Sequence, residues 1–367
     1  MNNKLKLGII YGGRSGEHEV SLMSARSVLS VIDTNKYDVI EIGITRKGLW
    51  LVGENLWQRL KSEDYSGLKP AYFLPMPKNP GIYVEIDDKL TLYSSLDVIF
   101  PVMHGSFSED GTIQGLFELA NIAYVGAGVL GSAVCMDKAL WKDIMSAHHL
   151  PVLPYQVFTR SELDADLEAC IQAAETIAGY PLFTKPANLG SSVGISKCNH
   201  RDDLVDGLLK AARYDRRVLV EKGLKKPREI EVSVLGNENP SASIPGEVVP
   251  KDEFYTYAEK YINDTAELLL TANLPQNVIE EIQELAIKAY RATDCAGMGR
   301  VDFLIDRETM AVYLSEINTI PGFTQISMFP KLWEASGLSY AALIEKLIDL
   351  AFERKMQQDG IEREYRS

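Results

Sequence analysis

The residues best able to do chemistry stand in two short alternating runs near the carboxyl end of the chain. One run carries Arg300 and Asp302, and the other carries Glu316 and Asn318. Both runs alternate apolar and polar residues, which is typical of β-strands, and the polar residues between them suit a hairpin turn. If the turn centres near Thr309, Asp302 lies opposite Glu316 and Arg300 lies opposite Asn318. We then expect all four side chains on one face, because the side chains of a strand share a face at every second residue.

Two carboxylates placed opposite each other across a hairpin repel, and a cation between them would relieve that repulsion. Because all the ligands are oxygens, the pattern favours magnesium or manganese over zinc or copper. Arg300 beside such a cation indicates that the metal holds a phosphate, which points to phosphoryl transfer. The hairpin alone leaves a plainer interpretation open, namely acidic residues on a solvated strand face.

Further segments could hold a nucleotide. The loop at residues 190–194 contains glycines and serines that could bring N–H groups and hydroxyls to a phosphate, or form an ordinary hairpin turn. Lys138 and Lys185 could each bind a phosphate as a point charge, or be solvated. Residues 220–224 could present backbone amides to an adenine while Glu229 accepts ribose hydroxyls, or they could form a domain linker.

Two other motifs need interpretation. Residues 254–261 are rich in tyrosine and could form a lid that excludes water, or an interface patch. Residues 126–131 spell a GxGxxG pattern, but no acidic residue ends a second strand about 20 positions later, as a dinucleotide site requires. We expect a tight connection between domains there.

The elements that must position these residues alternate between strands and helices. A strand over residues 4–10 is followed by a glycine loop at 11–19, an amphipathic helix, and strands at 39–44 and 98–102. This order predicts a parallel, Rossmann-like sheet, whose ligands gather at the carboxyl ends of the strands. Further helices are expected over residues 140–147, 164–177, 277–293 and 340–352, and further strands over residues 195–197, 218–221, 229–235, 300–305 and 312–318.

The composition is that of a globular protein of two or three domains, with 367 residues, 46% of them hydrophobic and 24% charged. The net charge of −13 offers no basic surface for nucleic acid or an anionic membrane. The four cysteines are scattered, which indicates a reducing compartment rather than a disulfide framework or a zinc site. We expect a cytoplasmic protein, because the chain lacks both a signal-peptide core and an apolar run of ~20 residues.

Taken in order, these motifs resemble those of the D-alanine–D-alanine ligase family of the ATP-grasp superfamily, and the resemblance covers essentially the whole chain. It rests on residues 12–21, 104–105, 109–112, 136–138, 185–186, 190–194, 255–261, 299–302 and 316–322. The chain departs from the family pattern at Thr256, where Asp is common, and at Gln325, where Ser is common. Neither position carries chemistry, so only the packing of the lid is affected.

The resemblance implies an α/β fold with a Rossmann-like domain over residues 1–126 and a two-lobed ATP-grasp module of α+β character. The small lobe is expected over residues 127–221 and the large lobe over residues 222–367, with the lid near residues 250–265. A homodimer is implied by the family alone.

The implied activity is the ATP-dependent ligation of two D-alanines to D-alanyl-D-alanine through an acyl phosphate, with release of ADP and phosphate. This reaction supplies peptidoglycan synthesis and hence the cell wall and cell shape. Two magnesium or manganese ions are implied together with ATP. The alternatives are a D-alanine–D-lactate ligase, another ATP-grasp carboxylate–amine ligase, and a catalytically inactive ATP-binding regulator.

The resemblance also implies binding roles for individual residues. The metal ligands would be Asp302, Glu316 and Asn318, with Glu316 bridging the two ions. Substrate contacts would come from His104 near the first D-alanine, and from Ser327 and Met328 at the carboxylate of the second. The residues that line the ATP site would be Lys138, Lys185, Glu221, Leu224 and Glu229.

The residues with implied catalytic roles are Glu17, Ser191, Lys260, Tyr261, Arg300 and Gly322. Glu17 would receive the ammonium group of the first D-alanine and share a hydrogen-bonded network with Ser191 and Tyr261. Arg300 and the backbone N–H of Gly322 would hold the oxyanion. Lys260 would reach the phosphoryl group during its transfer.

Overall fold

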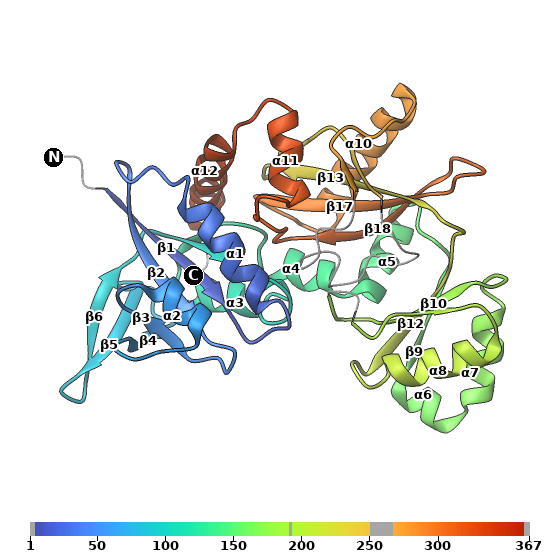
Figure 1. Ribbon diagram of the computed structural model, residues 1–367, viewed down its shortest axis with the longest axis horizontal. Coiled ribbons are helices and arrows are strands. Elements are labelled where there is room, and N and C mark those ends of the chain that lie inside the picture. Colours follow the sequence, from blue (N-terminus) through green and yellow to red (C-terminus); the bar gives the residue numbers. More distant parts are fainter. Residues whose placement is uncertain (1–3, 191–192, 250–266, 363–367) are drawn as a thin grey trace.

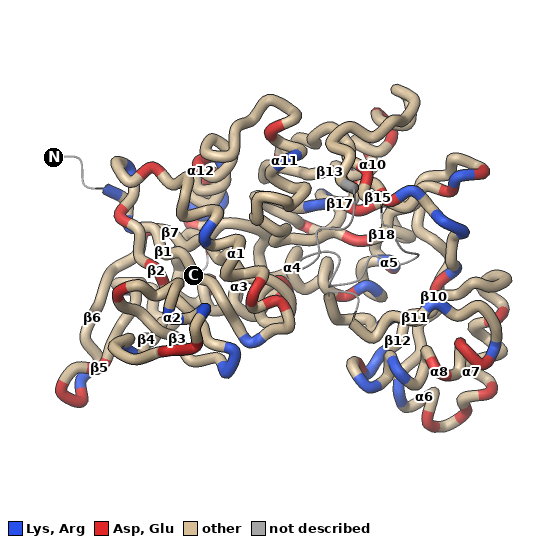
Figure 2. Tube along the Cα trace, viewed as in Figure 1, with Lys and Arg blue, Asp and Glu red and all other residues tan. Residues whose placement is uncertain are grey.

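Three β-sheets follow one another along the chain in the computed structural model (Figure 1). The structure describes residues 4–190, 193–249 and 267–362. The predicted α/β class is confirmed, and within these ranges no helix is long and apolar enough to cross a membrane. Acidic and basic residues are interspersed around all three sheets (Figure 2).

The first sheet has the strand order β6-β5-β4-β3-β2-β1-β7-β8. Its predicted parallel part consists of β1 (Leu5–Gly12), β2 (Tyr37–Ile44), β7 (Val98–Val102) and β8 (Ala123–Tyr124). An antiparallel extension that the sequence analysis missed consists of β3 (Trp50–Val52), β4 (Lys69–Phe73), β5 (Gly81–Ile86) and β6 (Lys89–Ser95). The two parts differ because β1 and β7 are continuous apolar runs, whereas β6 is mostly exposed.

Helices cover the parallel part of this sheet. Those nearest in sequence are α1 (His18–Leu29), α2 (Leu56–Ser62) and α3 (Thr112–Leu119). The last helix, α12 (Tyr340–Asp359), also belongs to this layer, because its buried side chains share a hydrophobic cluster with those of β1 and β7. It continues beyond residue 352, where the sequence analysis ended it. The chain therefore returns at its end to the sheet with which it began (Figure 1).

The second sheet is antiparallel, with the order β11-β10-β12-β9. Its strands are β9 (Tyr155–Thr159), β10 (Leu182–Pro186), β11 (Ser196–Cys198) and β12 (Arg217–Lys222). Its helices are α6 (Arg160–Ala165), α7 (Leu167–Glu175) and α8 (Arg201–Ala211). The single helix predicted over residues 164–177 is wrong, because Asp166 adopts a non-helical conformation and caps α7 by accepting the N–H of Ala169.

The third sheet has the order β16-β15-β13-β17-β18, with β14 paired to β13. Its strands are β13 (Arg228–Leu235), β14 (Ser241–Ala242), β15 (Gly246–Val249), β16 (Glu267–Leu269), β17 (Met298–Ile305) and β18 (Val312–Asn318). Its helices are α4 (Val129–Met136), α5 (Lys138–Ala147), α10 (Gln276–Ala292) and α11 (Met328–Ala335). Buried side chains of α5 and α10 share one cluster with those of β13, β17 and β18, which holds the hairpin rigidly.

Residues 126–128 of the GxGxxG segment lie in the short connection from β8 to α4, and residues 129–131 begin α4. Gly126 has a φ of +100°, and a Cβ added at Gly297 would lie 3.0 Å from the backbone nitrogen of Gly126. Two backbones therefore cross closely here, which requires glycine at both positions.

Candidate active site

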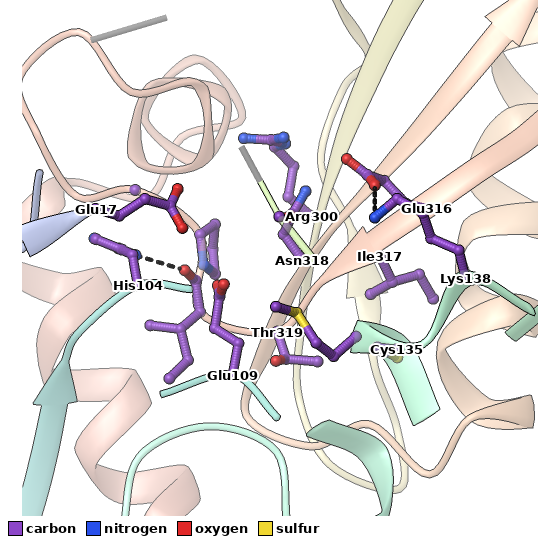
Figure 3. A pocket seen from close by; sticks show the side chains of 15 residues that line it. Glu17, His104, Glu109, Cys135, Lys138, Arg300, Glu316, Ile317, Asn318 and Thr319 are labelled. Atoms are coloured by element: carbon purple, nitrogen blue, oxygen red, sulfur yellow. Dashed lines mark hydrogen bonds and ion pairs between the residues drawn. The ribbon is translucent and has the colours of Figure 1, made fainter. Parts of the chain in front are cut away.

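A pocket lies between the first and third sheets, with α4 and α5 at its edge (Figure 3). Glu17 enters it from the loop after β1, and His104 and Glu109 enter it from the loop after β7. Because β1 and β7 are parallel neighbours, their carboxyl ends bring these loops together, as the sequence analysis expected. On the opposite side stand Lys138, at the start of α5, and Glu316, on β18 (Figure 3).

The predicted register of the β17–β18 hairpin is confirmed. Asp302 pairs with Glu316, and Arg300 pairs with Asn318. The register shifts just beyond Asp302, because Phe303 pairs with Leu314. The turn is therefore centred half a residue earlier than expected, and a β-bulge restores the pairing of the polar residues. Bulges commonly redirect side chains beside active sites.

The guanidinium of Arg300 lies at the centre of the polar face of the hairpin. It donates to both carboxylate oxygens of Asp302, with Nε–Oδ1 and Nη2–Oδ2 distances of 2.7 Å. Its Nε is also 3.1 Å from Oε2 of Glu231 on the neighbouring strand β13. Asn318 Nδ2 donates to Oδ2 of Asp302 at 3.2 Å. The sequence analysis missed Glu231. It could have been noticed because it stands two residues after Glu229, and residues two apart share one face of a strand.

Lys138 connects the hairpin to the second sheet. Its ammonium is 3.1 Å from Oε2 of Glu316 and donates to the carbonyl of Leu189, also at 3.1 Å. Leu189 precedes the glycine–serine loop after β10. One cation thus links the predicted metal ligand to the predicted phosphate loop.

A buried carboxylate lies between two lysines beside this point. Glu221 forms a close ion pair with Lys185 through Oε1, and its Oε2 is 2.9 Å from Nζ of Lys142. Burial would raise the pKa of Glu221, but the two ammonium groups outweigh it and lower the pKa to about 2. Burial lowers the pKa of Lys142, against the attraction of Glu221. The sequence analysis missed Lys142. It could have been noticed because it stands four residues after Lys138, and residues four apart share one face of a helix.

The side of the pocket formed by the first sheet carries a pair of carboxyl groups around Gly105. A Cβ added at Gly105 would lie 2.5 Å from Oε2 of Glu17, and the N–H of Gly105 donates to Oε2 of Glu109 at 2.9 Å. Burial, together with the charge of Glu17, raises the pKa of Glu109 to about 8. Burial lowers the pKa of His104. Glu109 appeared in the sequence analysis only as part of a motif, with no role of its own.

The remaining predicted residues are placed as follows. Gly322 and Ser327 lie together, because a Cβ at Gly322 would be 2.7 Å from Oγ of Ser327. Ser327 occupies the position before the first turn of α11, and Met328 is the first residue of that helix. Leu224 is buried, and the charge of Glu229 acts on Lys185, which places Glu229 near the buried ion pair. The predicted residues that lie outside the described ranges are Ser191, Lys260 and Tyr261.

The donor atoms at the hairpin suit a hard cation only in part. Asp302, Glu316 and Asn318 supply two carboxylates and one amide oxygen. Among the described residues, no group of three or more His, Cys, Asp or Glu side chains is placed to hold a metal ion. Magnesium is usually bound by one or two carboxylates and completed by phosphate oxygens and water. The donor set therefore fits a metal that arrives with a phosphate.

Known proteins resemble this chain over nearly its full length. Residues 6–127 match the family model described as D-ala D-ala ligase N-terminus, and residues 144–349 match the one described as D-ala D-ala ligase C-terminus. The D-alanine–D-alanine ligase of Heliobacterium modesticaldum is 48% identical over 362 residues, covering 98% of both chains. That of Thermoanaerobacter pseudethanolicus is 50% identical over 353 residues, covering 95% of this chain and 97% of the relative.

Solved structures agree with this result. The D-alanine-D-alanine ligase of Coxiella burnetii has a TM-score of 0.82 and 34% identity, covering 97% of this chain and 96% of its own. The VanG D-Ala:D-Ser ligase of Enterococcus faecalis has a TM-score of 0.84 and 34% identity, covering 95% of this chain and 100% of its own. This chain therefore belongs to the D-alanine–D-alanine ligase family.

Proposed function

We propose that this protein is an ATP-dependent ligase that joins two D-alanines into D-alanyl-D-alanine for peptidoglycan synthesis. The observation that carries the proposal is one pocket in which a carboxylate, Glu17, faces an arginine-bearing hairpin and Lys138, with the Lys185–Glu221 ion pair beside it. Such a pocket can bind an amino acid by its ammonium group while cations neutralise the phosphates of a nucleotide beside it.

In the first step, the carboxylate of the first D-alanine attacks the γ-phosphorus of ATP. The bond to the bridging oxygen breaks, and an acyl phosphate and ADP are formed. Glu17 holds the ammonium group of this D-alanine, and Lys138 and Lys185 neutralise phosphate oxygens. The chain therefore contributes mainly position and charge, as in other phosphoryl transfers.

In the second step, the amine of the second D-alanine attacks the acyl carbonyl, loses a proton, and expels phosphate from the tetrahedral intermediate. Arg300 and the backbone N–H of Gly322 hold the oxyanion. Ser327 and Met328 bind the carboxylate of the second D-alanine. The support for this role is their position at the amino end of α11, where the helix dipole and unpaired N–H groups favour an anion.

Asp302, Glu316 and Asn318 would hold magnesium or manganese. Bound there, the metal would neutralise charge on the phosphates of ATP. Glu221, Leu224 and Glu229 complete the nucleotide site, and Ser191, Lys260 and Tyr261 keep their predicted roles as proposals.

We propose three further properties. The chain divides into domains over residues 1–126, 127–221 and 222–367, with a lid near residues 250–265. It works in the cytoplasm, where its nucleotide is available, and it forms a homodimer. Light scattering of the purified protein tests the homodimer, since a molar mass near that of one 40.8 kDa chain would contradict it.

The deciding experiment measures ADP release and identifies the product by mass spectrometry. We expect turnover with D-alanine, little with L-alanine, and D-alanyl-D-alanine as the product. D-Serine and D-lactate should each be offered together with D-alanine, because one solved relative carries the name of a D-Ala:D-Ser ligase. A mixed dipeptide or depsipeptide as the main product near neutral pH would refute the proposed second substrate. ATP binding without ADP release would indicate an inactive regulator.

A further inference from the structure

The short segment at residues 320–323, here called the oxyanion loop, is held by a chain of hydrogen bonds from helix α1 and the loop after β7. The carbonyl of Ile320 lies 3.0 Å from Nδ1 of His104 (Figure 3). Because a carbonyl oxygen can only accept, Nδ1 must carry the proton of this bond. In the neutral ring, Nε2 is then an acceptor, and the deep burial of His104 favours the neutral ring.

The partner of Nε2 is Ser24, which lies on α1 and is fully buried. Its Oγ is 3.0 Å from Nε2 of His104, and it accepts the backbone N–H of Phe323 at 3.3 Å. A backbone N–H can only donate, so the serine oxygen accepts from Phe323 and its own O–H donates to His104. Each hydrogen bond from Phe323 through Ser24 and His104 to Ile320 therefore has one fixed donor and one fixed acceptor.

Ser24 is 299 residues from Phe323 in sequence, and His104 is 216 residues from Ile320. Both nevertheless hold the same four-residue segment. The segment is also held from the other side, since the carboxyl of Glu109 accepts backbone hydrogen bonds from Gly105 and Ile320. Gly322 lies between the two gripped residues. The peptide unit that carries its N–H therefore lies between two peptide units that these bonds hold.

We propose that Ser24 and His104 are positioning residues that hold the oxyanion loop, and with it the Gly322 N–H, at the acyl carbonyl oxygen. This inference rests on the proposed function. Both ring nitrogens of His104 already bond protein atoms, so His104 acts through the loop rather than by proton transfer. The proposed effect is on the rate, because a donor aimed at developing charge loses its value when it is displaced.

The first test replaces Ser24→Ala and compares it with Ser243→Ala. Ser243 is a matched control, because it is also fully buried and its hydroxyl also accepts one backbone N–H and donates one hydrogen bond, in this case to a carbonyl, but neither of its partners lines the pocket. We expect kcat to fall about tenfold in the Ser24 variant while the KM for ATP changes less than twofold. The control should lose comparable stability with kcat within twofold of wild type. A Ser24 variant that keeps wild-type kcat while it loses stability would overturn the inference.

The second test needs no variant to be active and no ligase assay. Nitrogen-15 NMR of wild-type protein with labelled histidine distinguishes the two neutral tautomers and the imidazolium, and a His104→Gln variant assigns the signal among the five histidines. We expect the neutral form with the proton on Nδ1 at pH 7. An imidazolium, or a neutral ring with its proton on Nε2, would overturn the hydrogen-bond directions assigned to Ser24 and His104. If wild-type protein forms no dipeptide, the proposed function fails, while the tautomer still decides whether this chain of bonds exists.

Discussion

The substitution Lys142→Met tests how the lysines of the proposed nucleotide site are kept available to bind phosphate. Lys142 is only 2% exposed, and it shares the buried carboxylate of Glu221 with Lys185. The pKa of Glu221 is about 2 instead of 4.5. At about 1.4 kcal/mol per pKa unit, this shift corresponds to about 3 kcal/mol of stabilisation of the carboxylate after the cost of burial, and an equal division assigns about 1.5 kcal/mol of it to each lysine. Because the pKa is lowered, this stabilisation is complete at pH 7 and is lost as the pH falls toward 2.

The methionine variant should affect nucleotide binding more than folding. The free energy of unfolding should fall by no more than about 1.5 kcal/mol, because Lys185 still neutralises Glu221 and one buried ammonium no longer has to be desolvated. In this variant, Lys185 is the ammonium group that still pairs with Glu221 among the described contacts. Moving that group toward a phosphate therefore costs about 1.5 kcal/mol more than in wild type. We therefore expect the KM for ATP to rise about tenfold.

Steady-state kinetics and denaturant unfolding check these two numbers. Lys288→Met is the matched control, because Lys288 forms a lysine–glutamate pair with Glu284 at 2.6 Å, but in that pair both side chains are more than half exposed. An exposed pair contributes ~0–1 kcal/mol, so the control should keep both its stability and its KM for ATP. A Lys142 variant whose KM for ATP stays within twofold of wild type would refute the reasoning, because Lys185 would then be available without Lys142.

Two other variants probe the pocket. Glu316→Ala should lower turnover by roughly 100–1000-fold, the usual cost of losing one charge-stabilising group, and near wild-type turnover at ordinary magnesium would contradict the proposed metal role. Glu109→Gln should flatten the pH dependence of the free energy of unfolding. Because the pKa of Glu109 is raised to about 8, its contribution to stability is complete below the ordinary glutamate pKa and is lost as the pH rises through 8. Unfolding free energies at pH 5 and pH 9 should therefore differ more in wild type than in this variant, and equal differences would contradict the assignment.

The hairpin shows how far local sequence patterns could predict the site. Alternation, with a turn assumed to centre near Thr309, placed Asp302 opposite Glu316, and the structure has that pair. The assumed turn centre was off by half a residue, and the pair forms because a bulge makes up the difference. A bulge has no clear signal in alternation, because it changes the partner of a residue without changing the residue types around it.

Contacts between distant segments were beyond the sequence analysis for a different reason. Ser24 looks like any polar residue on an amphipathic helix, and its partner Phe323 lies 299 residues away. Lys142 lies one helical turn from Lys138, but its burial depends on an ion pair with Glu221, which lies on a strand of the second sheet. The motifs could therefore be located on loops and strands, whereas the residues that support them appear only when three sheets come together.

The pairing of charges in the pocket has a consequence for how a nucleotide binds. Arg300 bonds Asp302, Lys138 pairs with Glu316, and Lys185 pairs with Glu221. A phosphate that enters must therefore exchange partners with carboxylates rather than meet isolated cations. Cations bound at Asp302 and Glu316 would release Arg300 and Lys138 toward phosphate, which would make metal and nucleotide binding cooperative. Glu221 is the exception, because Lys142 already supplies its second positive charge. Lys185 can thus turn to the nucleotide without leaving a buried carboxylate uncompensated.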